Sequence, residues 1–334
     1  MPRPLREQVV VVTGASSGVG RAVARAFGAS GCRVGLIART REALQNAARE
    51  IGETGGEGLV LPLDVAEAAA VDRAADAVVS KWGRIDTWVN DAMVSVFSPV
   101  SEMKAEEYRR VTEVNYLGTV YGTLAALRHM RRTGEGTIIQ IGSALVYRSI
   151  PLQSAYCASK AAIRGFTDSL RCELVHEKSR IRVTMLQLPA VNTPQFEVVR
   201  TRLPRRPKPV PPIYQPELIA RAVLRTARRP ARELWLAPSA IKAIVGQRLV
   251  PGWLDRYLGR IGYHAQQTDE PLAPGQPDNV FQPLPGDRGA HGRFDAEARS
   301  TSLEVRARLH ARGLTAAVTA AALLSWLGIR AWRA

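Results

Sequence analysis

Two residues that could move a proton stand four positions apart in the stretch SAYCASK, at Tyr156 and Lys160. The stretch is predicted to begin a helix, and residues four apart share one face of a helix. A phenol with an ordinary pKa of about 10 would then lie beside an ammonium group whose ordinary pKa is slightly higher. Such a pair can be an acid–base device or a chance arrangement on a surface, so the surrounding elements must decide.

The elements that must position this pair alternate between apolar strands and helices from residue 8 to about residue 237. Apolar strands separated by helical patterns rich in Ala, Glu and Arg indicate a parallel sheet covered on both faces. The strand-like runs are QVVVVTG, RVGLIA, GLVLPLDV, IDTWVN, GTIIQIGS, IRVTMLQL and RELWLAP. They predict an α/β fold with a doubly wound, seven-stranded parallel sheet of the Rossmann-like type over residues 1–237.

The pattern changes after residue 237, which predicts an added C-terminal extension, partly helical and partly irregular. Residues 238–264 contain two short amphipathic helical pieces, divided at Pro251. Residues 265–300 are rich in Pro, Gly, Asp and Gln and are predicted to form a linker without regular structure. A last apolar helix is expected within residues 301–334.

The composition indicates a basic globular protein in a reducing compartment. The chain carries 46 Lys and Arg against 30 Asp and Glu, and its pI is near 10.5. Three scattered cysteines indicate free thiols, and the N-terminus leaves no room for a secretory signal, so a cytoplasmic location is expected. No aromatic interleaving or motif accompanies the charge, so no nucleic-acid partner is expected. His291 stands in a glycine-rich stretch, and no metal site is predicted.

A glycine loop follows the first strand and opens a helix, with glycines at Gly14, Gly18 and Gly20. The N–H groups of a helix start there would face a phosphate, which predicts a dinucleotide site more strongly than a simple tight turn. At the end of the second strand, where a fold that prefers NAD usually has a carboxylate, the chain has Ala38 followed by Arg39. A guanidinium can bind a ribose 2′-phosphate, so NADP(H) is predicted in preference to NAD(H). The alternative is that Arg39 only lines a solvated helix start.

These residues resemble the short-chain dehydrogenase/reductase family over roughly residues 6–237. TGASSGVG is similar to the TGxxxGxG loop, VNYLG supplies Asn115, IGSA supplies Ser143 and YCASK matches YxxxK, with the Tyr 13 positions after the Ser. LDV, at residues 63–65, matches the place where an Asp of the family contacts the adenine, and Asp64 is that residue here. The resemblance implies that the cofactor contacts are Gly14, Ser16, Ser17, Gly18, Val19, Gly20, Arg39, Asp64, Val65, Asn90, Ala92, Tyr156, Lys160, Pro189, Val191 and Thr193.

The resemblance also implies a role for each catalytic residue in the reduction of a carbonyl by hydride transfer. Tyr156 would give the proton to the forming alkoxide and would take it back in the oxidative direction. Lys160 would lower the pKa of Tyr156 and bind the nicotinamide ribose, because a nearby positive charge favours the phenolate. Ser143 would hold the substrate oxygen, and Asn115 would anchor a water that links Lys160 to solvent. A homo-oligomer is expected on the same ground.

Two stretches depart from the family pattern near the expected nicotinamide site. NDAM stands where the family has NNAG, so Asp91 and Met93 change the floor of the site, and PAVNT places Ala190 where the family has glycine. Neither departure removes a residue that moves a proton. The main reading is therefore an NADP(H)-dependent oxidoreductase, and the alternative is a catalytically weak nucleotide-binding protein that acts as a membrane-associated sensor or scaffold.

The expected substrate side is apolar, with a basic segment beside it. An apolar lining indicates a small hydrophobic ketone, aldehyde or alcohol, and the residues expected in it are Met93, Val94, Val96, Leu145, Val146 and Phe196. The segment after the sixth strand either recruits an anionic or lipid-like substrate or is a solvated basic loop. Its cations are Arg200, Arg202, Arg205, Arg206 and Lys208.

The last predicted helix contains 16 residues without a charge, at 314–329. This is short of the roughly 20 residues that a membrane span needs. Arginines stand on both sides, and Trp326 and Trp332 suit a membrane interface. The segment is a candidate membrane anchor or interfacial helix on the cytoplasmic face. The alternatives are a helix packed on the protein or on a partner, and disorder.

Overall fold

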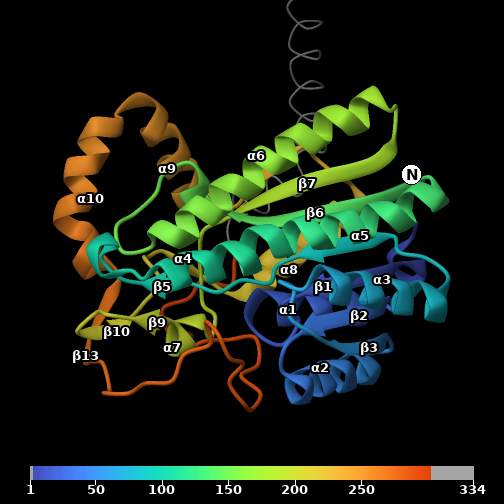
Figure 1. Cartoon of the computed structure of the whole chain (residues 1–334), viewed down its shortest axis with the longest axis horizontal. Helices are drawn as coiled ribbons and strands as arrows, with labels where there is room; N and C mark the ends of the chain where they lie inside the picture. Colours follow the sequence, from blue (N-terminus) through green and yellow to red (C-terminus); the bar gives the residue numbers. More distant parts are fainter. Residues whose placement is uncertain (1–2, 302–334) are drawn as a thin grey trace, which may run out of the picture.

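The computed structural model describes residues 3–301 and contains the predicted sheet (Figure 1). Seven parallel strands lie in the order β12-β7-β6-β4-β1-β2-β3. Their bounds are β1 Val9–Thr13, β2 Arg33–Ala38, β3 Glu57–Pro62, β4 Thr87–Asn90, β6 Glu135–Ser143, β7 Arg180–Leu188 and β12 Glu233–Trp235. The predicted seven-stranded α/β fold is therefore confirmed.

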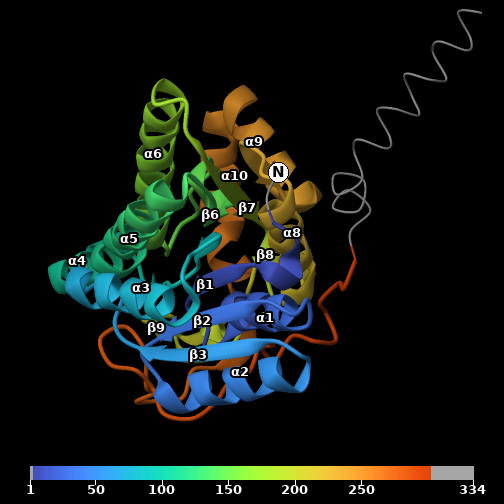
Figure 2. The same cartoon turned by 90° about the vertical axis from the view of Figure 1, so that its right-hand side faces the viewer.

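Helices cover both faces of the sheet (Figure 2). One apolar cluster holds residues of α1, α2 and α8, whose bounds are Gly18–Gly28, Arg41–Glu53 and Pro216–Arg228. The cluster on the other face holds residues of α3, α5 and α6, whose bounds are Ala68–Trp82, Gly118–Thr133 and Ser154–His176. Strand β1 shows why both faces need cover, because Val10 and Val12 point into the first cluster while Val9 and Val11 point into the second.

The strand order places a reversal at the centre of the sheet. From β1 the chain moves outward through β2 and β3, and β4 then pairs with the opposite edge of β1. Loops that leave the carboxyl ends of β1 and β4 diverge there, and this crevice is where open α/β sheets bind their ligands. The glycine loop after β1 and Asn90 at the end of β4 both lie at this edge.

Smaller elements complete the described chain beyond that edge. Short strands pair β5 Val96–Phe97 with β9 Arg200–Thr201, β8 Ala190–Val191 with β11 Ile213–Tyr214, and β10 Arg205–Pro207 with β13 Gln267–Pro271. The remaining α-helices are α4 Ala105–Val111, α7 Gln195–Val198, α9 Ala237–Leu249 and α10 Pro251–Ala265, with a π-helix at Thr112–Leu117. Short 3-10 helices lie at Leu5–Glu7, Val100–Glu102 and Ala144–Val146.

The C-terminal extension is more ordered than its composition indicates. Helices α9 and α10 match the two helical pieces expected over 238–264, and the second begins at Pro251 as predicted. The expectation that 265–300 lacks regular structure is wrong at β13, and the segment also buries Val280 and Phe294. Within residues 3–301, no helix is long and apolar enough to cross a bilayer. The candidate anchor at 314–329 lies outside the described residues.

Candidate active site

The glycine loop is built so that a ligand can approach its backbone closely. Gly14 and Gly18 have φ angles of +74° and +59°, which side chains rarely tolerate. Gly20 has an ordinary φ, but a Cβ on it would stand 2.2 Å from the carbonyl oxygen of Gly14. The turn from β1 into α1 therefore depends on glycine at all three predicted positions, and it directs the N-terminus of α1 into the crevice.

Ser143, Tyr156 and Lys160 meet at this crevice from two elements. Ser143 is the last residue of β6, while Tyr156 and Lys160 lie in the first two turns of α6. Lys160 donates from Nζ to the carbonyl oxygen of Ile141 at 2.7 Å, and this Nζ lies 5.6 Å from the centre of the Tyr156 ring. The predicted pair therefore shares one face of the helix, and that face points at the glycine loop, with which it lines a cavity of about 160 Å³.

Burial sets the acid–base properties of the pair. It lowers the pKa of Lys160 to about 8, against the opposing charge of Asp91. It raises the pKa of Tyr156, and a hydrogen bond with Ser143 opposes this change. This rise in the pKa of Tyr156 is opposite to the lowering expected from the sequence. The reason is that burial of the phenol outweighs the groups that stabilise the phenolate.

Asp91 supplies a charge whose role the sequence reasoning missed. It lines the same cavity as Lys160 and Tyr156, and its backbone N–H donates to Oγ1 of Thr13 at 3.0 Å. Burial raises the pKa of its carboxyl to about 7, while Lys160 and the N–H of Gly20 oppose the rise. The residue was identified only as a departure in the floor of the site. Its position after β4 could have indicated a partner for the buried lysine.

Asn115 holds the loop after β4 against the helix that carries the pair. It lies in the π-helix, is fully buried, and accepts from the Val94 N–H at 2.8 Å. Its Nδ2 donates to the Val94 carbonyl oxygen at 3.0 Å and to Oγ of Ser159 at 3.1 Å. Ser159 in turn donates to the carbonyl oxygen of Tyr156. Asn115 is thus linked to Tyr156 through a single side chain.

Only some of the other predicted cofactor residues line the cavity at the glycine loop. Those that line the cavity beside Tyr156 and Lys160 are Gly14, Ser17, Gly18, Val19, Val191 and Thr193. Pro189 lines a neighbouring cavity. Asn90 faces the helix layer, because its Nδ2 donates to Gln140 and Thr123 and its Oδ1 accepts from Trp88. Asn90 therefore supports β4 from behind the cavity.

Arg39 and Asp64 lie at the ends of β2 and β3 and contact other parts of the protein. Arg39 donates from Nη2 to the carbonyl oxygen of Asn279 at 2.5 Å and from Nη1 to that of Phe281 at 3.3 Å. Asp64 forms an ion pair with Arg110 of α4. The two side chains predicted to bind the adenosine end of a cofactor therefore already have partners in this structure.

A larger, mainly apolar cavity of about 340 Å³ opens beside the first and reaches Ser143 and Tyr156. Of the predicted lining residues, Met93, Leu145 and Phe196 line it, whereas Val94 and Val96 lie in the core. Val146 is not among its lining residues. Sequence reasoning missed the opposite wall, because helix α10 comes from the extension; its residues there include Tyr257, Leu258 and Ile261.

The basic segment after β7 is largely neutralised by carboxylates. Arg200 and Arg202 both contact Glu107, which is fully buried, at 3.3 and 2.8 Å. Arg205 pairs with Asp269, and Arg206 with Glu270, at 3.2 and 3.6 Å. Lys208 differs, because it lines the apolar cavity. The loop is therefore fastened to α4 and to the extension, and Lys208 is its cation at the cavity.

The sequence of this chain is similar to those of known oxidoreductases. The family model described as short chain dehydrogenase matches residues 8–203. The uncharacterized oxidoreductase YxnA of Bacillus subtilis is 32% identical over 333 residues, which cover 99% of this chain and 93% of that protein. A fatty acyl-CoA reductase of Acinetobacter baylyi is 31% identical over 242 residues, 72% of this chain and 81% of that one.

Solved structures agree with these sequence relatives. An alcohol dehydrogenase from Thermococcus sibiricus, complexed with 5-hydroxy-NADP, superposes with a TM-score of 0.59 at 29% identity and covers 69% of this chain and 95% of its own. A metagenomic short-chain oxidoreductase in complex with NADP gives 0.58 at 30% identity, over 70% and 97% of the two chains. The glycine loop, the seven-stranded sheet and these matches together place the chain in the short-chain dehydrogenase/reductase family.

Proposed function

We propose that the protein is an NADP(H)-dependent oxidoreductase that interconverts a hydrophobic ketone or aldehyde and the corresponding alcohol. One observation carries the proposal. Tyr156 and Met93 line both the cavity at the glycine loop and the larger apolar cavity. A nicotinamide ring in the first and a carbonyl group in the second would therefore meet at the Tyr156 hydroxyl.

The residues around the first cavity suit the nicotinamide half of a dinucleotide. The loop carries no side chain at Gly18 or Gly20, and the helix it opens has its N-terminus at the cavity, where a phosphate would bind. When bound, the cofactor supplies or accepts the hydride. The preference for NADP(H) rests on Arg39 after Ala38, and the two similar structures described above, whose complexes hold 5-hydroxy-NADP and NADP, are in keeping with it.

The chain's own residues then hold the carbonyl oxygen and deliver the proton. Ser143 Oγ, fixed by the Leu145 N–H at 3.1 Å, donates to the substrate oxygen beside Tyr156. Tyr156 gives its proton to that oxygen as negative charge develops on it. Lys160, held at the Ile141 carbonyl, stabilises the phenolate left behind, and Asp91 keeps more of Lys160 protonated than burial alone would.

The substrate class follows from the walls of the second cavity. Apolar side chains line most of it, and Lys208 adds a cation beside Pro209 and Val210. The arrangement suits an apolar chain with its carbonyl at Tyr156 and an anionic or polar group near Lys208. A relative named for reduction of fatty acyl-CoA is compatible with this class.

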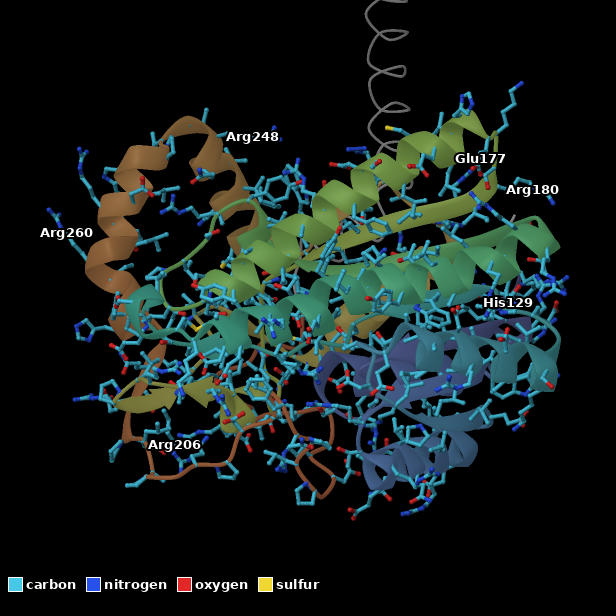
Figure 3. The ribbon with its side chains drawn as sticks, viewed as in Figure 1. His129, Glu177, Arg180, Arg206, Arg248 and Arg260 are labelled. Carbon is cyan, nitrogen blue, oxygen red and sulfur yellow. The ribbon has the colours of Figure 1, made fainter. Side chains whose placement is uncertain are left out.

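A membrane surface is the proposed source of such a substrate. Helices α9 and α10 form an arch over the cavity, and most of the exposed large apolar residues of the described chain lie on it: Val245, Leu249, Val250, Trp253, Tyr257, Ile261 and Tyr263. Figure 3 shows Arg248 and Arg260 on the same arch. Apolar side chains flanked by arginines suit an anionic lipid interface.

Vesicle binding tests the membrane contact. Leu249 and Trp253 are 74% and 58% exposed, so replacing both with Ser should leave the fold intact and lower binding of the full chain to phosphatidylglycerol-rich vesicles about tenfold. Val100→Ser, at an equally exposed site off the arch, is the control. Equal binding by all three proteins would exclude the arch as the docking surface. The cytoplasmic location and a homo-oligomer stay predictions, and light scattering tests the second.

A substrate screen tests the function itself. The purified protein is incubated with NADPH or NADH and with aldehydes and ketones of increasing chain length, and loss of the reduced cofactor is followed. We expect turnover that favours NADPH and rises with apolar chain length. Tight NADPH binding without turnover on the whole panel would instead support the catalytically weak nucleotide-binding protein.

A further inference from the structure

A segment far along the chain crosses the adenosine side of the cofactor groove. Residues 278–289, here called the strap, run past the ends of β2 and β3 after leaving the region of α7, where the Asn279 N–H donates to the Val198 carbonyl oxygen at 3.0 Å. Besides the two carbonyls that hold Arg39, the Leu284 carbonyl accepts from Oγ1 of Thr40 at 3.3 Å. The main-chain oxygens of the strap thus accept hydrogen bonds from the side chains of Arg39 and Thr40, where the oxygens of a ribose 2′-phosphate would do so.

The middle of the strap is buried at the place predicted for the adenine. Val280 is fully buried and belongs to the apolar cluster that contains Val65 and Val114. Its carbonyl oxygen accepts from Nε of Arg110 at 3.0 Å, and the same guanidinium pairs with Asp64. Asp64, the predicted adenine contact, therefore already pairs with Arg110, and the predicted cofactor residue Val65 lies in the same apolar cluster as Val280.

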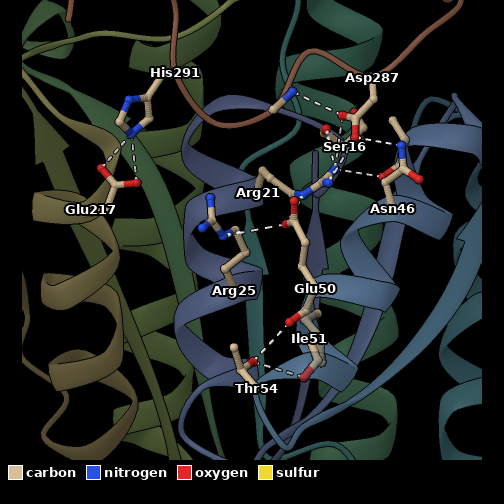
Figure 4. A network of polar contacts seen from close by, with 12 residues as sticks. Ser16, Arg21, Arg25, Asn46, Glu50, Ile51, Thr54, Glu217, Asp287 and His291 are labelled. Carbon is tan, nitrogen blue, oxygen red and sulfur yellow. Dashed lines mark hydrogen bonds and ion pairs between the residues drawn. The ribbon is translucent and has the colours of Figure 1, made fainter.

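The end of the strap reaches the start of α1. The Gly289 carbonyl accepts from the Gly18 N–H at 3.0 Å, so it occupies a helix N-terminal donor that a phosphate would use. Figure 4 shows Asp287 fixed by Arg21 and Asn46 at the same helix end. Asp287 accepts from Nη2 of Arg21 at 3.1 Å and from Nδ2 of Asn46 at 2.8 Å.

From these contacts we propose that the strap occupies the adenosine half of the cofactor groove in the free enzyme, and that binding of the dinucleotide displaces it. The inference rests on the proposed cofactor. The nicotinamide half is open, because the cavity at Tyr156 and Lys160 lies beyond the strap and meets it at Asn279. The strap thus competes with the cofactor for the groove. The apparent affinity for cofactor is therefore lower than the intrinsic affinity, by the fraction of molecules in which the strap has left the groove.

Hydrogen exchange on the full chain tests the displacement without any substrate. The probes are NADPH, 2′,5′-ADP as the adenosine half and reduced nicotinamide mononucleotide as the other half. We expect NADPH and 2′,5′-ADP to increase exchange of the amides in 278–289, and the mononucleotide to leave it unchanged. Protection of the strap by NADPH would mean that it closes over bound cofactor, and this result would overturn the proposal.

A variant at the strap end gives a second, independent readout. Asp287→Ala removes the contacts with Arg21 and Asn46 but no predicted cofactor ligand, and should lower the apparent Kd for NADPH about tenfold, the factor that corresponds to about 1.4 kcal/mol. Asp269→Ala, which removes an exposed ion pair of β13, is the control and should leave the Kd unchanged. An unchanged or higher Kd in Asp287→Ala overturns the strap as a competitor. Failure of every protein to bind any of the probes would instead overturn the proposed cofactor.

Discussion

Arg39 is the residue on which the predicted cofactor preference depends. Replacing it with Leu removes the guanidinium at the end of β2 that a 2′-phosphate would contact, while NADH has no such phosphate. A hydrogen bond with a charged partner contributes about 1.5–3 kcal/mol, which corresponds to roughly a 10- to 150-fold change in a dissociation constant. The Kd for NADPH should therefore rise, by that factor less the severalfold gain that either cofactor draws from a loosened strap.

The same substitution should act in the opposite direction on NADH. Arg39→Leu also removes the two hydrogen bonds to the Asn279 and Phe281 carbonyls, so the strap is held less firmly. NADH binding should consequently become severalfold tighter. The two cofactors then change in opposite senses, and this pattern separates a lost phosphate contact from general damage to the site.

Fluorescence titration of both reduced cofactors at fixed ionic strength measures the effect, because phosphate contacts are sensitive to salt. The control is Arg41→Leu, which removes an exposed arginine from the first turn of α2. Equal weakening of NADPH and NADH by Arg39→Leu, or the same loss of NADPH affinity in Arg41→Leu, would refute the assignment of the 2′-phosphate to Arg39.

Three further predictions concern the catalytic residues and the substrate cavity. The pKa of Lys160 is lowered to about 8 in the native protein, whereas a lysine in the unfolded chain has a pKa of about 10.4. Between these two pH values the unfolded chain binds more protons than the native protein, so the free energy of unfolding must rise with pH there. Denaturant unfolding at pH 8 and pH 10 should show a gain of about 2 kcal/mol that Lys160→Met lacks; parallel curves would contradict the buried ammonium. Asp91→Asn should lower the Lys160 pKa further and move the alkaline fall of kcat to lower pH, and an unshifted pH profile would remove Asp91 from the acid–base set. Ala243→Phe should fill part of the apolar cavity and raise KM for long-chain carbonyls at least tenfold, while KM for short ones stays unchanged. The reason is that each methylene excluded from the cavity forfeits about 0.8 kcal/mol. Equal KM changes for both would mean that the alkyl chain of the substrate binds elsewhere.

Much of the sheet and of the catalytic set could be predicted because the signals are local. Continuous apolar runs mark buried parallel strands, and the glycines follow β1 directly. Tyr156 and Lys160 need only helical spacing to share a face, and the same helix brings that face to Ser143. Even so, the direction of the Tyr156 pKa change was missed, because burial depends on the whole surrounding structure.

The contacts made by the extension could not be predicted, because they join residues far apart in sequence. Nothing periodic marks 278–289, and its order comes from partners such as Arg39, which stands 240 residues before Asn279. The same holds for α10, whose amphipathic pattern predicts a helix but not that its Tyr257 and Ile261 close the apolar cavity. The carboxylates that neutralise Arg200 and Arg202 likewise meet them only through the fold.

The central claim is that Tyr156 delivers the proton at the junction of the two cavities. The most direct test is the single-turnover rate of NADPH oxidation with an apolar aldehyde, compared between the wild-type protein and Tyr156→Phe, with Tyr263→Phe on the exposed side of α10 as the control. Loss of a positioned general acid should slow Tyr156→Phe by about 10²- to 10⁴-fold while its NADPH Kd stays within about twofold. A Tyr156→Phe rate close to that of the wild type, with the cofactor bound equally well, would contradict the account.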